Sequence, residues 1–312
     1  MDCAVCLSAL EEQTTLSCGH SFHAPCILEC GMASPHPVPP CPLCREPLKE
    51  VQEGLTALTR YKTSGLLVGD RVLMEKAAAY GSVRCAHELG NIYYDGIGVE
   101  VDRLRGENYW KQSTRCFNSC SRLAYLENER RNTPQAIVYF KKAIEINPSA
   151  AGHMVKLAKL LGPTDEADEL FMTALSLYVY YPETQAEIYF LVGSNLVKRQ
   201  RQEEASAYYE QCLELNPDHT KARMMAALTT YDAEVAHAHA DYLLAKNAND
   251  VEAICLKARL HIEDDNILEA DRLRVFASTL APNSKAVVRL EDNMRQFVGP
   301  VTRKRARQCS GR

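Results

Sequence analysis

Residues 3–44 read CAVCLSALEEQTTLSCGHSFHAPCILECGMASPHPVPPCPLC and contain eight regularly spaced cysteine and histidine side chains. In order they are Cys3, Cys6, Cys18, His20, His23, Cys26, Cys41 and Cys44, with the spacing C-x2-C-x11-C-x1-H-x2-H-x2-C-x14-C-x2-C. Structural zinc takes four sulfur or nitrogen ligands in a tetrahedron, and a C-x2-C pair lets two thiolates of one tight turn reach the same ion. Eight such ligands predict two closed sites, each holding one Zn2+ ion that stabilises a segment too short to fold alone.

Cysteine is the unusual feature of the composition, because seven of the 13 cysteines lie within the first 44 of 312 residues. Clustered cysteines without an apparent secretory signal indicate metal ligands more often than disulfides. Since zinc requires reduced thiolates, we expect a cytoplasmic or nuclear protein. No apolar run approaches the ~18 residues of a membrane span. The net charge of -4 gives no general attraction for nucleic acid, so neither a membrane nor a nucleic-acid partner is expected.

The order and spacing of the eight residues resemble the RING finger, in its variant with histidines at the fourth and fifth ligand positions. The resemblance covers about residues 1–48. It implies interleaved sites, in which one ion is bound by Cys3, Cys6, His23 and Cys26 and the other by Cys18, His20, Cys41 and Cys44. The spacing alone does not decide this pairing, since two zinc fingers that follow each other along the chain could use the same ligand types.

RING fingers of ubiquitin ligases form no covalent intermediate with ubiquitin; they bind a ubiquitin-charged conjugating enzyme and hold its thioester in a reactive position. By resemblance, Val5 and Pro42 would contact the conjugating enzyme, and Arg45 would bridge it to ubiquitin with the five donors of its guanidinium. Cys30 occupies a contact position where many RING fingers have Trp or Leu, which predicts weaker docking or an unusual partner. Packing around zinc is the alternative role of Val5 and Pro42, and a solvated side chain is the alternative for Arg45.

Glycine and proline punctuate the polar residues from 45 to 70, so we expect a linker over residues 49–69 with one short helix near 51–61. The following segment, with Leu89-Gly90, Asp95-Gly96-Ile97-Gly98-Val99 and Tyr109-Trp110, resembles a Sel-one-like repeat, a helix–loop–helix unit that we assign to residues 70–113. Gly90 would let its two helices approach closely, and Gly96 and Gly98 would permit a tight loop. An unrelated helical hairpin is the alternative.

A repeat period of 34 or 35 residues separates Pro148, Pro182 and Pro217, which end helix-like runs. Counted back from Pro217, Gly193, Ala205 and Tyr209 resemble the small, small and aromatic positions of tetratricopeptide repeats. We therefore expect tetratricopeptide-like repeats with a capping helix over residues 114–298 and a flexible basic tail over 299–312. The repeat units lie near 114–148, 149–182, 183–217, 218–249 and 250–282, with the capping helix over 284–297.

The predicted fold is a small zinc-stabilised RING domain followed by an all-α helical-repeat solenoid, a class whose groove commonly binds proteins or peptides. The resemblance to RING fingers implies a RING-type E3 ubiquitin transferase that docks a ubiquitin-charged conjugating enzyme and recruits an unknown protein substrate on its repeats. A non-catalytic zinc-binding adaptor or scaffold protein is the alternative, which Cys30 favours. A ligase that accepts ubiquitin on cysteine would need an activated thiol, whereas Cys85, Cys116, Cys120, Cys212 and Cys255 lie in helical segments and are expected to be buried.

Overall fold

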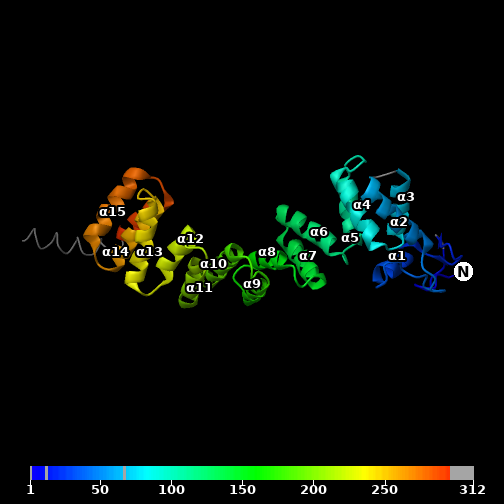
Figure 1. Cartoon of the computed structure of the whole chain (residues 1–312), viewed down its shortest axis with the longest axis horizontal. Coiled ribbons are helices and arrows are strands. Elements are labelled where there is room, and N and C mark those ends of the chain that lie inside the picture. The colour runs from blue at the N-terminus through cyan, green and yellow to red at the C-terminus, as the bar shows by residue number, and fades with distance from the viewer. Residues whose placement is uncertain (1, 11–12, 66–67, 296–312) are drawn as a thin grey trace, which may run out of the picture. The chain divides into compact units, whose positions relative to one another are not determined.

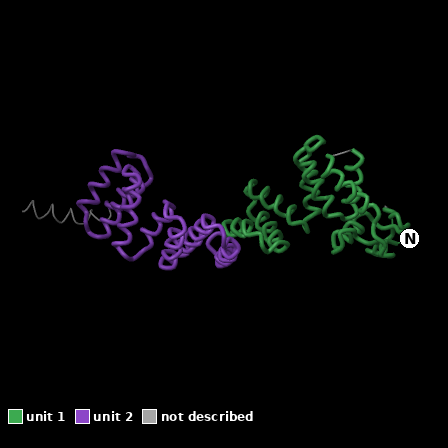
Figure 2. The backbone as a smooth tube through the Cα atoms, in the orientation of Figure 1, with its two compact units in different colours: residues 1–161 green, residues 162–312 purple. Residues whose placement is uncertain are grey.

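The computed structural model describes residues 2–10, 13–65 and 68–295. The chain forms two compact units, residues 1–161 and residues 162–312 (Figure 2). No helix in the described ranges is long and apolar enough to cross a lipid bilayer.

In unit 1 a two-stranded antiparallel hairpin follows the first cysteine turn. The rest of the unit is mainly helical, with the helices α1 to α8 in Figure 1. The hairpin consists of β1 (Thr14–Thr15) and β2 (Ser21–Phe22), with Thr14 paired to Phe22. The helices are α1 (Ala24–Ala33), α2 (Lys49–Ser64), α3 (Val68–Ala79), α4 (Val83–Asp95), α5 (Arg103–Gln112), α6 (Phe117–Glu129), α7 (Thr133–Ile146) and α8 (Ala151–Leu161).

Unit 2 is helical throughout its described residues. Its helices are α9 (Asp165–Leu177), α10 (Pro182–Lys198), α11 (Gln202–Leu215), α12 (Thr220–Thr229), α13 (Ala233–Lys246), α14 (Val251–Glu263) and α15 (Ile267–Leu280), followed by a further helix over 285–295. That last helix lies where we expected the capping helix. The expected basic tail over 299–312 lies outside the described residues.

The short helix expected near residues 51–61 is part of α2, which is longer than expected and occupies most of the expected linker over residues 49–69. Val51 belongs to the core that surrounds the N-terminal cysteines, whereas Ala57 and Leu58 belong to the core shared with α3 and α4. Gly54 does not break the helix; a Cβ there would lie 2.8 Å from the carbonyl oxygen of Leu73. The glycine that suggested flexibility therefore permits close packing of α2 on α3.

The close approach predicted at Gly90 is present between α4 and α5. A Cβ at Gly90 would collide with the Trp110 ring, whose Cγ would lie 3.0 Å away, and Trp110 is almost fully buried. Gly96 ends α4 with a φ of 71°, and Gly98 has a φ of 68°, a region that side chains other than glycine rarely adopt. These glycines make the helix–loop–helix unit possible.

The small and aromatic positions expected in the repeats lie in their cores. Gly193 on α10 packs against the Tyr209 ring on α11, and Ala205 and Tyr209 are both fully buried. The pairs α6–α7, α8–α9, α12–α13 and α14–α15 each fall within one of the expected repeat units. The pair α10–α11 begins one residue before its expected unit, because Pro182 starts α10 and does not end the preceding helix. In the second of these units Phe171 on α9 is also buried.

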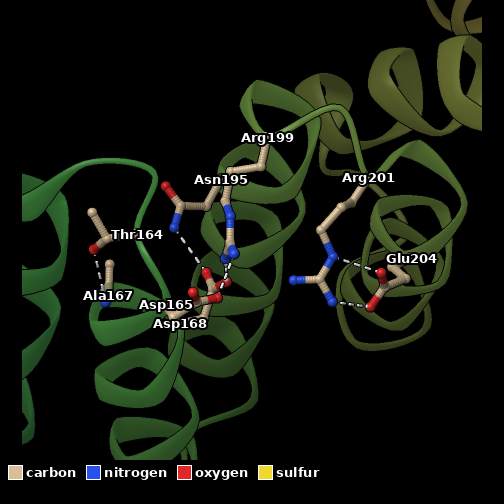
Figure 3. Close-up of polar contacts among 8 residues, drawn as sticks. All are labelled: Thr164, Asp165, Ala167, Asp168, Asn195, Arg199, Arg201 and Glu204. Carbon is tan, nitrogen blue, oxygen red and sulfur yellow. Dashed lines mark hydrogen bonds and ion pairs between the residues drawn. The ribbon is translucent and has the colours of Figure 1, made fainter.

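Polar contacts also join α9 to α10 within unit 2 (Figure 3). Asp168 accepts hydrogen bonds from Asn195 at 2.8 Å and from Arg199 at 2.6 Å, and Arg199 also contacts Asp165. Thr164 caps α9 by accepting from the backbone N–H of Ala167 at 3.2 Å. Because Asp168 and Arg199 neutralise each other while mostly buried, this cluster has a structural role.

Candidate metal centre

The eight predicted ligands form two separate clusters. The first contains Cys3, Cys6, His23 and Cys26, the second Cys18, His20, Cys41 and Cys44, and within each cluster the ligand atoms lie within 4.8 Å of one another. In the first, Cys6 Sγ is 3.2 Å from His23 Nδ1. In the second, His20 Nδ1 is 3.5 Å from Cys18 Sγ and 3.7 Å from Cys41 Sγ. The interleaved pairing is thus confirmed, and the alternative of sequential fingers is wrong.

Both C-x2-C pairs lie on turns of the same construction. The backbone N–H of Leu7 donates to Cys3 O at 2.8 Å, and that of Arg45 donates to Cys41 O at 2.9 Å. Leu7 and Arg45 have φ values of 61° and 62°, and the turns close with hydrogen bonds from Cys3 to Ser8 and from Cys41 to Glu46. Each turn therefore directs two thiols to one point, as a shared ion requires.

The fifth and sixth ligands are positioned by the start of α1. His23 is its N-cap residue and Cys26 lies in its first turn. The Nε2–H of His23 donates to the carbonyl oxygen of Ala9 at 3.0 Å, which leaves Nδ1 facing the thiol of Cys6. Such a hydrogen bond fixes the tautomer and orientation of a metal-binding imidazole.

Thiol acidity differs within the first cluster. Burial raises the pKa of Cys3, but hydrogen bonds from neighbouring backbone groups outweigh it and lower that pKa to about 6. Partial burial, together with Cys6 and Cys3, raises the pKa of Cys26 to about 12. Metal binding must therefore displace the Cys26 proton. Three cysteines and one histidine in each cluster fit one Zn2+ ion, so the zinc finger fits two ions with no ligand position left open for a substrate.

The residues expected to contact a conjugating enzyme lie close to the metal clusters. Val5 is 36% exposed on the first cysteine turn, Pro42 and Arg45 line one hollow beside the last, and Cys30 is half-buried on α1. Sequence reasoning missed Leu7 and Leu43, which are 79% and 51% exposed on the same two turns. Their exposure could have been predicted from the sequence, because a tight turn between two metal ligands cannot bury every side chain and both residues lie next to a ligand.

Comparison with known families identifies the N-terminal segment and one repeat. Residues 3–44 match the family model for the zinc finger of C3HC4 type (RING finger), and residues 186–219 match a tetratricopeptide repeat. This chain has His23 where the C3HC4 pattern has cysteine. Tripartite motif-containing protein 10 from Sus scrofa is 38% identical over 52 residues, and that from Bos taurus is 40% identical. Each match covers 16% of this chain and only 11% of the relative.

Solved structures resemble the helical part in fold. A tetratricopeptide repeat protein from Parabacteroides merdae has a TM-score of 0.50 at 17% identity, over 69% of this chain and 86% of that one. PilF from Pseudomonas aeruginosa has a TM-score of 0.48 at 16% identity, over 78% of this chain and 96% of that one. The chain thus combines a small N-terminal zinc-binding domain of RING type with an all-α solenoid of tetratricopeptide-like repeats.

Proposed function

We propose that the protein is a RING-type E3 ubiquitin ligase whose zinc finger binds a ubiquitin-charged conjugating enzyme and whose repeats recruit a protein substrate. The observation that carries this proposal is the pair of complete metal clusters whose cysteine turns expose Val5, Leu7 and Leu43 to solvent. Exposed apolar side chains on metal-fixed turns are suited to protein docking, because little side-chain or loop freedom is lost on binding.

Catalysis would consist of positioning the charged conjugating enzyme. Arg45 lies directly after the last ligand, and its backbone is held by the hydrogen bond to Cys41. Its exposed guanidinium is available to bridge ubiquitin and the conjugating enzyme, the role that the family resemblance implies. The closed metal clusters support this mechanism, because they leave zinc no open position at which to activate a reacting group.

Transfer through the four buried cysteines of the described helices is not favoured, whereas Cys116, which was expected to be buried, is partly exposed. Burial raises the pKa of four helix-packed thiols to about 11: those of Cys85, Cys120, Cys212 and Cys255. At neutral pH such thiols are protonated and shielded, whereas a ubiquitin acceptor must be an accessible thiolate.

The RING domain is attached firmly to the first helices, which would help it present a charged enzyme in a defined orientation. Glu50 on α2 accepts hydrogen bonds from the backbone N–H of Ser17 at 2.9 Å and from its hydroxyl at 3.3 Å. Gly31 on α1 lies against the backbone of Tyr80 and Gly81. Arg115 donates to the carbonyl oxygen of Ser34 at 2.9 Å, at the C-terminal end of α1. Within the described residues of unit 1, these contacts join the zinc finger directly to the helices.

A groove in unit 2 is the surface that we assign to substrate recruitment. Met224, Leu228, Leu256 and Leu290 supply its apolar lining. Its charged residues are Arg259, Lys285, Arg289 and Glu252. Arg259 is paired with Glu263 at 3.0 Å. Since cations outnumber acidic groups here, the groove best complements a substrate segment that combines apolar and acidic side chains.

The direct test is ubiquitin transfer by the full chain, loaded with two zinc equivalents, with a panel of conjugating enzymes. Leu43→Asp should abolish ubiquitin products while zinc content and helicity stay unchanged. Leu104→Asp is the matched control, because Leu104 is 69% exposed on α5, outside the zinc finger. Equal activity of the two variants would contradict docking on the cysteine turns.

The second candidate is a zinc-binding adaptor without transferase activity, and the observation that favours it is the small, half-buried Cys30 on α1. A thiol contributes less apolar area to docking than Trp or Leu would. Folded, zinc-loaded protein that yields no ubiquitin products with any conjugating enzyme would decide for the adaptor.

A further inference from the structure

Two histidines and an aspartate come together in the last repeats, far along the chain from the zinc finger. His237 Nε2 lies 2.6 Å from Asp264 Oδ2, and the rings of His237 and His261 have centroids 4.9 Å apart. One ligand atom from each of the three residues lies within 4.8 Å of the other two. His237 is on α13, His261 is in the last turn of α14, and Asp264 is the C-cap residue of α14.

The helical geometry explains why these three side chains meet. His261 and Asp264 are three residues apart at the end of α14, so their side chains lie on one face. Helix α13 packs against α14 and brings His237 to that face. The neighbouring His239 points elsewhere: it is buried and contacts Glu210 at 2.9 Å. His237 and His239 therefore do not face a common metal site, although they are only two residues apart in the sequence.

The donors suit a first-row divalent cation. Imidazole nitrogens bind Zn2+, Ni2+ and Co2+ well, and two imidazoles with one carboxylate form a known metal-binding set with open positions. The site also lies at the carboxyl end of α14, where the helix dipole favours positive charge. His237 and Asp264 line one hollow, whose other charged residues, Arg259 and Glu263, are paired with each other at 3.0 Å.

We propose that His237, His261 and Asp264 form a third metal site, which binds a divalent transition-metal ion such as Zn2+ and joins α13 to the end of α14. The side chains of His237 and Asp264 are 20% and 40% exposed, so an ion can enter without unfolding the repeat. If the three side chains moved apart slightly, an ion could sit between them with metal–ligand bonds of about 2.0–2.2 Å.

The test is a calorimetric titration of the full chain with Zn2+ after both RING sites have been filled and excess metal removed. A third equivalent of Zn2+ should bind. Both His261→Gln and Asp264→Asn should weaken binding of that third ion by at least about tenfold, because changing even a residue that only supports a ligand lowers metal affinity by about 10–100-fold. His219→Asn is the matched control: it removes the histidine that lies 3.4 Å from Glu187 and replaces it with a good helix N-cap residue.

Imidazole nitrogen resonances in the same titration identify the ligands. Those of His237 and His261 should shift at the third equivalent, while those of His20 and His23 stay constant. Absence of a third equivalent, or its retention at full affinity in both variants, would overturn the proposal. Because the RING ligands are not altered, either result leaves the proposed ubiquitin transfer to be judged separately.

Discussion

Replacement of Gly31 by alanine should separate the zinc finger from the helices that follow it. A Cβ at this position would overlap the carbonyl oxygen of Tyr80, and it would lie 2.9 Å from Gly81 Cα and 3.0 Å from the carbonyl carbon of Tyr80. Ordinary carbon contacts are about 3.5–4.0 Å, so the two segments would have to move apart by roughly 0.5–1 Å. Because all three obstacles are backbone atoms, no side chain can rotate to make room.

The expected magnitude follows from two opposing effects. Overpacking costs about 1–3 kcal/mol, whereas alanine favours helix α1 over glycine by up to about 1 kcal/mol. A net loss of about 1–2 kcal/mol should increase opening of the α1 contact roughly 5–30-fold. Amide hydrogen exchange would detect this as faster exchange in α1 and at the end of α3, with two zinc ions retained.

Gly69→Ala is the control for this substitution. Gly69 lies within α3, and no heavy atom lies within 4 Å of the position that its Cβ would take. There the same chemical change should stabilise the helix by about 0.5–1 kcal/mol. If Gly31→Ala slows exchange as Gly69→Ala should, the close backbone contact between the zinc finger and the helices does not exist.

Replacement of both Cys41 and Cys44 by serine should lower bound zinc from two equivalents to one, and circular dichroism should also report lost helix, because Cys41 shares a core with Val51 of α2. Unchanged helicity would mean that α2 folds independently. Arg45→Ala should keep both zinc ions but slow ubiquitin discharge from the conjugating enzyme, and normal discharge would rule out the bridging role. Burial lowers the pKa of His153 in the folded protein below its usual 6.5. As pH drops through 6.5, His153 is therefore protonated more readily in the unfolded chain than in the folded one, and the free energy of unfolding should fall. His153→Gln should reduce the slope of melting temperature against pH between 5 and 7, and an unchanged slope would assign it to other groups.

The metal ligands could be predicted from the sequence because their spacing is a local chemical constraint. A C-x2-C pair needs little beyond its own turn to bind zinc, and the structure repeats one turn at Cys3 and Cys41. The small residues of the repeats were predictable for a similar reason. Gly193 lies at the distance from Pro217 where a small residue was expected, and it admits the ring of Tyr209.

The extent of helix α2 was harder to predict, because glycine can either end a helix or allow close packing within it. Gly54 and Gly65 both suggested a linker, yet Gly54 is buried between helices, whereas Gly65 ends α2 with a φ of 87°. Only the packing of α3 distinguishes them. The cluster of His237, His261 and Asp264 required the same long-range information, since His237 and His261 lie on different helices. Sites built within a turn can therefore be predicted from spacing, whereas sites built between repeats require knowledge of which helix faces meet.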